Sequence, residues 1–320
     1  MELFEYLEKT AETVDMTLHR HYGSVYGELY KASAHLLLAG GKRLRPAVLL
    51  LSADAVNHGR SDDLIPAALA MELIHTFTLI HDDIMDEDKE RRGVPTVHVE
   101  WDEPTAILAG DVLYANAFEF LCRSMTDDRS RVKAITMLAR TCAQICEGQH
   151  MDMSFERRRD VTVAEYLEMV QKKTGALYGA SAAIGGMLAG GNAVQVNALY
   201  AYGLSAGVAF QIQDDLIDMA EHSEKIGKDR GSDIREGKQT LISIKAQEKG
   251  LDLSKFQKKI TNEEMDRLVA DLHKRGVLSE VRAVAEEHAN AAKASLNILP
   301  ASEERGLLKD IVDYFISRGH

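Results

Sequence analysis

The sequence predicts an all-α fold that forms a single domain over residues 1–320, and three observations support this prediction. Apolar residues recur at intervals of three and four along most of the chain, as they do on one face of a helix. The chain has only five prolines, and no Asn-Gly or Asp-Gly pair indicates a β-hairpin. No long stretch rich in proline or serine divides it, so we expect one helical domain.

The first half of the chain gives six expected helices. The N-terminal segment MELFEYLEKTAETVDM is acidic and amphipathic, which favours a helix. Pro66 and Pro104 each fit the first turn of a helix, where a proline is tolerated. The expected helices cover residues 2–20, 24–39, 45–57, 65–86, 104–124 and 130–150. The stretch that remains, 87–103, is expected to be irregular.

The second half of the chain gives seven more expected helices. Capping-box patterns at Thr162–Glu165 and Thr261–Glu264 mark two helix starts. The expected helices cover residues 162–174, 176–190, 193–221, 239–249, 262–275, 278–298 and 303–317. Residues 222–238 are expected to be irregular and, like 87–103, they carry basic residues directly after an acidic cluster.

These acidic clusters share the pattern DDxxD and are Asp82-Asp83-Ile84-Met85-Asp86 and Asp214-Asp215-Leu216-Ile217-Asp218. In a helix, residues four apart share a face, so each cluster presents two carboxylates in one direction. Mg²⁺ prefers oxygen ligands and is usually bound by one or two carboxylates together with substrate phosphates. Two such helices facing one cavity would therefore form a site for a metal-bridged diphosphate.

Each cluster also has a non-functional interpretation, because a single DDxxD is often only the solvent-exposed end of a helix. Here both clusters follow apolar helical stripes, such as Leu73–Ile80 and Val208–Ile212. Burying a pair of carboxylates without partners costs several kcal/mol. Two buried pairs therefore indicate that cations complete the site.

A basic, glycine-containing segment precedes one expected helix. Gly40 and Gly41 would allow the backbone to approach a ligand closely, and Lys42 and Arg45 follow them just before Pro46. A helix N-terminus favours anions, and lysine and arginine are the two side chains that commonly hold phosphate oxygens. The alternative is an ordinary basic loop over a helix start.

Other basic residues lie close to the acidic clusters in the sequence. Arg91 and Arg92 follow Asp86, where they could clamp a diphosphate or form ordinary surface ion pairs. His75 lies two turns before Asp82 on the same helical face, although a core histidine is an equally simple interpretation. The remaining candidates are Lys173, Lys228 and Lys238.

Charge and composition exclude several classes of protein. The formal net charge of −12 argues against nucleic-acid binding, which requires basic patches. No run of 18 apolar residues indicates a transmembrane segment, and the acidic N-terminus is not a targeting peptide. Cys122, Cys142 and Cys146 lack metal-site spacing and are expected to be buried, reduced thiols. We therefore expect a cytoplasmic protein.

Taken together, the motifs resemble those of the trans-isoprenyl diphosphate synthase family, in particular its short-chain geranylgeranyl and farnesyl diphosphate synthases. The resemblance covers most of the chain, with the motifs in the order GGKRLRP, HDDIMDEDKERRGVPTVH, AGDVLYANAFE, EGQHMDM, KTG, FQIQDDLID and GKDRGSDIREGKQT. Each motif is weak alone, but the ordered set is specific. The resemblance implies an all-α bundle around a deep central cavity, usually in a homodimer.

The resemblance also implies a role for each matching residue. Several Mg²⁺ ions would be held by Asp82, Asp86 and Asp214, with support from Asp83, Asp215 and Asp218. Isopentenyl diphosphate would be bound by Lys42, Arg45, His75 and Arg92. The allylic diphosphate would be bound by Arg91, Lys173, Lys228 and Lys238. The catalytic groups beside the reacting carbon would be Lys173, Thr174 and Gln211.

The implied reaction needs no protein nucleophile. Diphosphate leaves the allylic carbon, and the double bond of isopentenyl diphosphate attacks the resulting cation, head to tail and all-trans. A proton is then lost to the released diphosphate. Cationic groups in a preorganised and partly dry site would stabilise the leaving group.

Product length is implied by the residues just before the first acidic cluster. Thr78 lies one turn before Asp82, and Phe77 precedes it. In the family, an aromatic residue at the position of Phe77 helps to limit the product, so we expect the C20 product geranylgeranyl diphosphate. A farnesyl or longer-chain synthase is the alternative, although a small residue would be expected here in a longer-chain enzyme.

Two more distant alternatives differ in class. A class I terpene cyclase would share the fold but normally carries a different second metal motif. A non-catalytic partner subunit would be expected to have lost an acidic motif or basic residues, and here neither is lost.

One departure from the family is Lys228-Asp229-Arg230, where relatives often have a Lys-Pro-Lys-like sequence.

Overall fold

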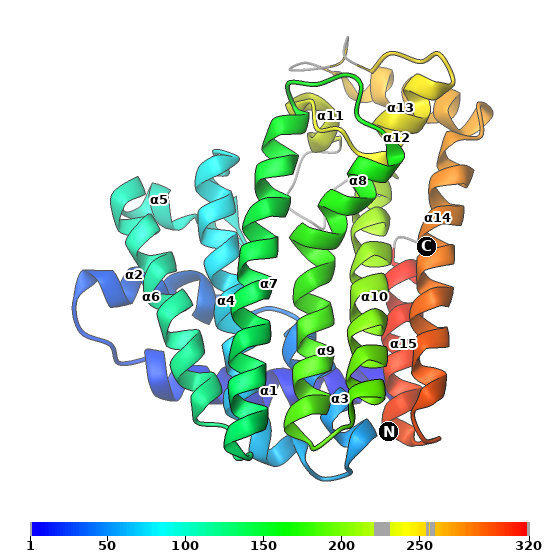
Figure 1. Ribbon diagram of the computed structural model, residues 1–320. Helices are drawn as coiled ribbons and strands as arrows, with labels where there is room; N and C mark the ends of the chain where they lie inside the picture. Colours follow the sequence, from blue (N-terminus) through cyan, green and yellow to red (C-terminus); the bar gives the residue numbers. More distant parts are fainter. Residues whose placement is uncertain (1, 221–230, 254–255, 257–259, 319–320) are drawn as a thin grey trace.

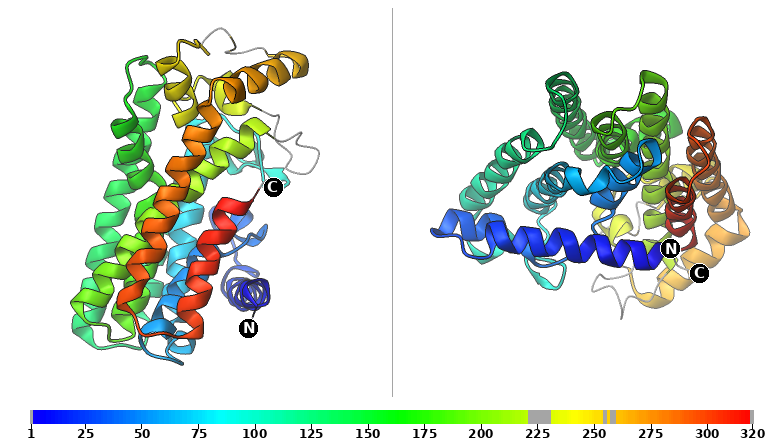
Figure 2. Two further views of the ribbon diagram at one scale, coloured as in Figure 1. Left: turned by 90° about the vertical axis from the view of Figure 1, so that its right-hand side faces the viewer. Right: turned by 90° about the horizontal axis from the view of Figure 1, so that it is seen from below.

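The computed structural model describes residues 2–220, 231–253, 256 and 260–318. Long helices stand side by side in an upright bundle, and shorter ones gather at its upper end (Figure 1). Seen from below, α1 (Leu3–Tyr22) runs along one side of the bundle, crosswise to the upright helices (Figure 2). The expected all-α fold is therefore confirmed.

The described helices up to residue 170 are α1, α2 (Glu28–Leu38), α3 (Leu44–Val56), η1 (Ser61–Leu64), α4 (Ile65–Met85), α5 (Val97–Glu100), α6 (Glu103–Cys122), α7 (Asp128–Phe155) and α8 (Val163–Val170). The later ones are η2 (Gln171–Gly175), α9 (Ala176–Leu188), α10 (Ala193–Ala220), α11 (Ser232–Glu236), α12 (Leu241–Glu248), α13 (Asn262–Lys274), α14 (Val277–Ser295), η4 (Leu296–Ile298) and α15 (Glu303–Ser317). Two short strands, β1 (Glu90–Arg91) and β2 (Val94–Pro95), pair antiparallel.

The core is built around the two helices that carry the acidic clusters. Helix α4 packs on α3 and α6, and α10 packs on α9 and α14. Both central helices are apolar on more than one face, because they are surrounded by other helices. The hydrophobic effect therefore fixes the two helices in place, and with them the two rows of carboxylates.

Local signals located most helix starts correctly. Pro66 and Pro104 lie in the first turns of α4 and α6. Both capping boxes form, with Thr162 and Glu165 at the start of α8 and Thr261–Glu264 at the start of α13. These signals succeed because a cap needs only residues that are neighbours in the chain.

The stretch 87–103 was expected to be irregular, and this is wrong in detail. It contains α5 and the hairpin of β1 and β2, joined by Arg92 and Gly93 with φ of 55° and 75°. Two positive φ values are typical of the tight turn that suits a hairpin. Arginine rarely adopts this conformation, so no hairpin was predicted from the residue types at this turn. In the second stretch, α11 forms among the described residues, whereas 221–230 lie outside them.

The cysteine prediction is correct for one residue only. Cys142 is buried, but Cys122 and Cys146 are exposed, and all three are free. Cys122 ends α6, and Cys146 lies at the edge of the buried stripe of α7.

Among the described residues, α4 and α6 are long and apolar enough to cross a membrane by length and composition alone. Core helices pass the same test, and the apolar window of α4 is 67% buried within the bundle.

Candidate functional site

The two acidic clusters lie at the same end of the bundle. Helix α4 ends at Met85, with Asp86 as its C-cap, and α10 runs to Ala220. Both helices point upward in Figure 1, toward the end where α8, α11 and α12 gather. Lys238, just after α11, reaches across with its Nζ 3.4 Å from Asp86 Oδ2. Both clusters therefore lie at the upper end of the bundle.

In the first cluster, the carboxylates are crowded and largely removed from water. Burial raises the pKa of Asp82 to about 6, and the neighbouring Asp86 adds to the shift while Lys173 opposes it. Burial likewise raises the pKa of Asp83 to about 6, although Asp83 forms a short ion pair with Arg91. The other carboxylate oxygen of Asp83, Oδ2, has no hydrogen-bond partner.

In the second cluster, every aspartate has a protein partner. Asp214 Oδ1 lies 2.8 Å from Arg318 Nη2. Asp215 is buried and accepts hydrogen bonds from Tyr166 and Gln211. Asp218 accepts bonds from Ser232 Oγ at 2.8 Å and from two backbone N–H groups at the start of α11. Asp218 therefore fixes the start of α11 against the end of α10.

The donor set fits a hard divalent cation. All the groups are carboxylate oxygens, burial penalises their charge, and one buried oxygen of Asp83 is unpaired. Among the described residues, no three His, Cys, Asp or Glu side chains converge closely enough to form a metal site by themselves. At a site for Mg²⁺, substrate oxygens and water would complete the few carboxylates.

Of the four residues expected to bind isopentenyl diphosphate, Lys42 and Arg45 lie near Asp214, and His75 lies near Arg45 and Arg92. The guanidinium of Arg45 lies 4.5 Å from the ring centre of Tyr178, and its Nε is buried without a partner. Burial lowers the pKa of His75 well below its ordinary value, as do the charges of Arg45 and Arg92. Lys42 completes the set and donates to Tyr314 Oη at 2.9 Å.

A buried ion network that the sequence did not indicate positions this region. Arg43, in the left-handed conformation at φ 46°, contacts Glu72 Oε1 at 2.5 Å and Asp15 Oδ1 at 2.7 Å. Glu72 also lies 3.6 Å from Arg92. Arg92 in turn packs against Gly41, where an added Cβ would lie 3.2 Å from its guanidinium. Glu72 therefore connects the basic loop to the hairpin.

The residues expected to bind the allylic diphosphate lie nearer the first cluster. Lys173 Nζ is 2.6 Å from Asp152 Oδ2. Burial lowers the pKa of Lys238, but the charges of Asp86 and its other acidic neighbours outweigh this effect and raise it overall. Arg91 is held by Asp83 and Asp88. Lys228 lies outside the described residues.

Lys173 and Thr174 owe their placement to a turn of π-helix. The sequence predicted a break near residue 175, but α8, η2 and α9 form a continuous run, and the Ala176 N–H bonds to the Gln171 carbonyl. Such bulges are frequent at functional sites. Glycines make room for it: a Cβ on Gly148 of α7 would lie 2.4 Å from the backbone nitrogen of Lys173.

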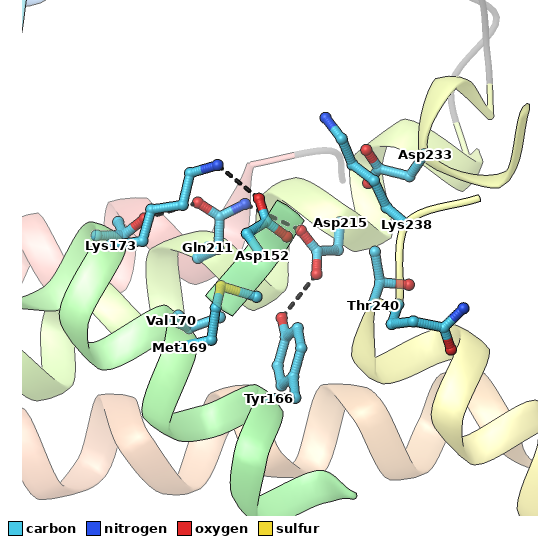
Figure 3. A pocket seen from close by; sticks show the side chains of 12 residues that line it. Asp152, Tyr166, Met169, Val170, Lys173, Gln211, Asp215, Asp233, Lys238 and Thr240 are labelled. Carbon is cyan, nitrogen blue, oxygen red and sulfur yellow. Dashed lines mark hydrogen bonds and ion pairs between the residues drawn. The ribbon is translucent and has the colours of Figure 1, made fainter. Parts of the chain in front are cut away.

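A pocket of about 460 Å³, its open mouth included, lies between α7, α8, η2 and α10 (Figure 3). Its lining residues are Asp152, Tyr166, Met169, Val170, Lys173, Thr174, Gln211, Asp215, Asp233, Lys238, Gln239 and Thr240. Lys173, Thr174 and Gln211, the expected catalytic residues, are thus brought together on one wall. The hydroxyl of Thr174 donates to Gln211 Oε1 at 3.0 Å.

The two expected chain-length residues lie on α4, one turn from the first cluster. Phe77 is half-buried and packs edge-on against His81 and against Tyr114 of α6, with ring centres 4.9 and 5.3 Å away. Thr78 donates to the His75 carbonyl at 2.8 Å, so its hydroxyl is satisfied within its own helix. Phe77 therefore lies between α4 and α6.

Three site residues were missed by sequence reasoning. Asp152 belongs to the EGQHMDM segment, but a lone aspartate gives no signal of its partner Lys173. Tyr166 has the appearance of an ordinary apolar-face residue. Arg318 lies at the end of the chain, stacked 4.1 Å from the ring centre of Phe210 and paired with Asp214. Only the tertiary fold reveals these contacts.

Comparison with known proteins gives a consistent result. The polyprenyl synthetase family model matches residues 27–273. Geranylgeranyl pyrophosphate synthase of Geoglobus acetivorans is 50% identical over 293 residues, covering 91% of both chains. Geranylfarnesyl diphosphate synthase of Natronomonas pharaonis is 44% identical over 308 residues, covering 91% of this chain and 90% of its own. A solved structure of geranylgeranyl pyrophosphate synthetase from Geoglobus acetivorans superposes with a TM-score of 0.91 at 46% identity, over 98% of this chain and 99% of that one.

Proposed function

The chain belongs to the polyprenyl synthetase family and is a trans-prenyltransferase, and we propose that it condenses isopentenyl diphosphate with allylic diphosphates to form geranylgeranyl diphosphate. The observation that carries this proposal is the pairing of two carboxylate clusters with two separate basic groups. Lys173 and Lys238 lie close to Asp82 and Asp86 of the first cluster, and Lys42 and Arg45 lie close to Asp214 of the second. This arrangement suits a reaction between two diphosphates. The relatives named for geranylgeranyl products support the C20 product.

Each group in the site has a distinct task in this reaction. Lys173 and Lys238, with Lys228 and Arg91, bind the allylic diphosphate and stabilise the charge that develops as it leaves. Lys42, Arg45, His75 and Arg92 hold the isopentenyl diphosphate. The oxygens of Thr174 and Gln211 face the reacting carbon. The proton that is lost passes to the departing diphosphate.

Mg²⁺ is the expected cofactor, held by Asp82, Asp86 and Asp214 with support from Asp83, Asp215 and Asp218. When bound, it would neutralise the negative charge of the diphosphate and of the carboxylates. For Asp214, binding requires that Arg318 share or yield the carboxylate. For Asp215 and Asp218, the existing hydrogen bonds favour an indirect role.

The test is a product analysis of the purified protein. It would be incubated with isopentenyl diphosphate, Mg²⁺ and the C5, C10 or C15 allylic diphosphate, and the dephosphorylated alcohols would be sized. A Mg²⁺-dependent C20 alcohol supports the proposal. A C15 or C25 product would leave the reaction intact and overturn the product length. A cyclic hydrocarbon would favour a terpene cyclase, and no product at all would favour a non-catalytic partner subunit.

Replacing Phe77 by alanine should lengthen the main product by at least one C5 unit. The ring packs against Tyr114 and His81 between α4 and α6, so its loss opens space beside the first cluster. The matched control is Phe118→Ala, which removes an aromatic ring that contacts Tyr114 but not Phe77 in this stack. An unchanged product spectrum for Phe77→Ala would exclude Phe77 as a length-limiting residue.

A cytoplasmic homodimer is the proposed state of the protein. Helix α6 supports the dimer, because its apolar window is only 39% buried and Ile107 and Leu108 are exposed. Exposed apolar faces of this kind commonly mark protein interfaces. Sedimentation should give twice the 35.4 kDa of one chain, and Leu108→Glu should shift the mass toward the monomer. A monomeric wild-type protein would contradict this proposal.

A further inference from the structure

A chain of hydrogen bonds links a buried tyrosine to the catalytic wall of the pocket (Figure 3). The hydroxyl of Tyr166 donates to Asp215 Oδ2 at 2.7 Å. The amide Nε2 of Gln211 donates to Asp215 Oδ1 at 3.0 Å, and Gln211 Oε1 accepts from Thr174 Oγ1 at 3.0 Å. The chain ties α8, η2 and α10 together at the point where the π-helical turn enters the pocket.

The carboxylate of Asp215 determines which way the Gln211 amide points. A carboxylate oxygen can only accept, so the NH₂ end of the amide must face it and the carbonyl end must face Thr174. The opposite orientation would set two acceptor oxygens against each other. The hydroxyl hydrogen of Thr174 is then used by Gln211, so the lone pairs of Thr174 Oγ1 and the second lone pair of Gln211 Oε1 remain available to the pocket.

Tyr166 is the outer anchor of this arrangement. It is 1% exposed, and Asp215 is 6% exposed, so neither side chain has bulk water as an alternative partner. A hydrogen bond to a buried charged group is stronger than one between neutral groups. Without the tyrosine hydroxyl, one carboxylate oxygen of Asp215 would lose its donor and the side chain would be free to reorient.

We propose that Tyr166 is a positioning residue that acts through Asp215 to orient Gln211 and Thr174 toward the reacting carbon. The proposal rests on the proposed function, since it assumes that these two oxygens face the allylic carbon. It assigns Asp215 a task that is separate from metal support.

The test is Tyr166→Phe, which removes the hydroxyl and keeps the ring. We expect kcat to fall about tenfold, with KM for isopentenyl diphosphate changed by less than about twofold. We also expect a larger fraction of the allylic diphosphate to be hydrolysed rather than condensed. The matched control is Tyr202→Phe, because Tyr202 is also fully buried and donates to the Leu308 carbonyl at 2.7 Å, outside the pocket.

A double-mutant cycle separates positioning from a general loss of stability. In the Gln211→Leu background, Tyr166→Phe should change kcat by less than about twofold, because the residue through which it acts is absent. Equal effects of Tyr166→Phe in both backgrounds, or equal effects of Tyr166→Phe and Tyr202→Phe on kcat, would overturn the proposal. A wild-type protein without condensation activity would instead overturn the proposed function.

A second comparison does not depend on folding of the Tyr166 variant. Gln211→Glu places a carboxylate opposite Asp215, so it should reduce kcat about tenfold more than Gln211→Leu does. Equal losses in the two Gln211 variants would show that Asp215 does not orient this position, and the proposal would fail.

Discussion

Changing Asp82 to asparagine should lower kcat about a thousandfold while it stabilises the metal-free protein. Asparagine keeps the shape of the side chain but removes the charge that Mg²⁺ and the diphosphate require. Asp82 lies one turn from Asp86 on α4, so the change leaves the helix and its packing intact. The measurement is steady-state kinetics at saturating Mg²⁺, with the exposed Asp310→Asn on α15 as the control.

The gain in stability follows from the same burial that makes Asp82 a good metal ligand. Its pKa is about 6 in the folded chain, against an ordinary value of 3.8. At pH 7 this difference costs on the order of 2 to 3 kcal/mol of folding free energy. The asparagine variant does not carry this cost, so its metal-free form should unfold at a higher denaturant concentration than the wild type.

The sign of the pH dependence is specific. A carboxyl with a raised pKa binds its proton more tightly in the folded state, so its penalty is absent below pH 4 and grows as pH rises through 6. The advantage of Asp82→Asn should therefore be largest at pH 7 and small at pH 4. Urea unfolding in EDTA at both pH values measures it. An advantage that does not depend on pH would contradict the assignment of the penalty to Asp82.

How well the sequence predicted the structure depends on the distance over which each feature is encoded. Helix caps at Thr162 and Thr261 and the DDxxD patterns are local, and the structure contains both caps and brings the two patterns to one end of the bundle. The hairpin at Arg92 could not be predicted from the sequence. Its turn contains a non-glycine residue with positive φ, and Glu72, twenty positions earlier, stabilises that residue. Local rules do not describe such long-range compensation.

The site was predictable in its residue types but not in its pairings. The acidic and basic residues could be selected by spacing and resemblance. Their partners could not, because Tyr166 meets Asp215 across 49 positions and Arg318 reaches Asp214 from the chain terminus. The π-helical turn at Lys173 also left no local signal, since it depends on the space that Gly148 leaves on α7. These contacts arise only when separate helices pack.

The second large loss of activity is expected for Lys173→Met, since Lys173 lies in the π-helical turn η2. The change should lower kcat/KM for the allylic diphosphate by about two to three orders of magnitude, with little change in KM for isopentenyl diphosphate. Lys173 is only 22% exposed, and its ammonium lies 2.6 Å from Asp152 and close to Asp82. Methionine preserves the length of the side chain but removes the charge that would face the leaving group.

The neighbouring Lys172 provides the control. It differs from Lys173 by one position, but the π-helical turn directs it to Glu147 and Glu168, at 3.0 and 2.9 Å, on the surface. Such exposed pairs contribute little to stability, so Lys172→Met should leave kcat/KM within about twofold of the wild type. Equal losses in the two variants would indicate that net charge, rather than the placement of Lys173 in the pocket, determines the rate. A large loss in Lys173→Met alone would tie catalysis to the position of the Lys173 ammonium in the pocket beside Asp152, because the two lysines carry the same charge at adjacent positions.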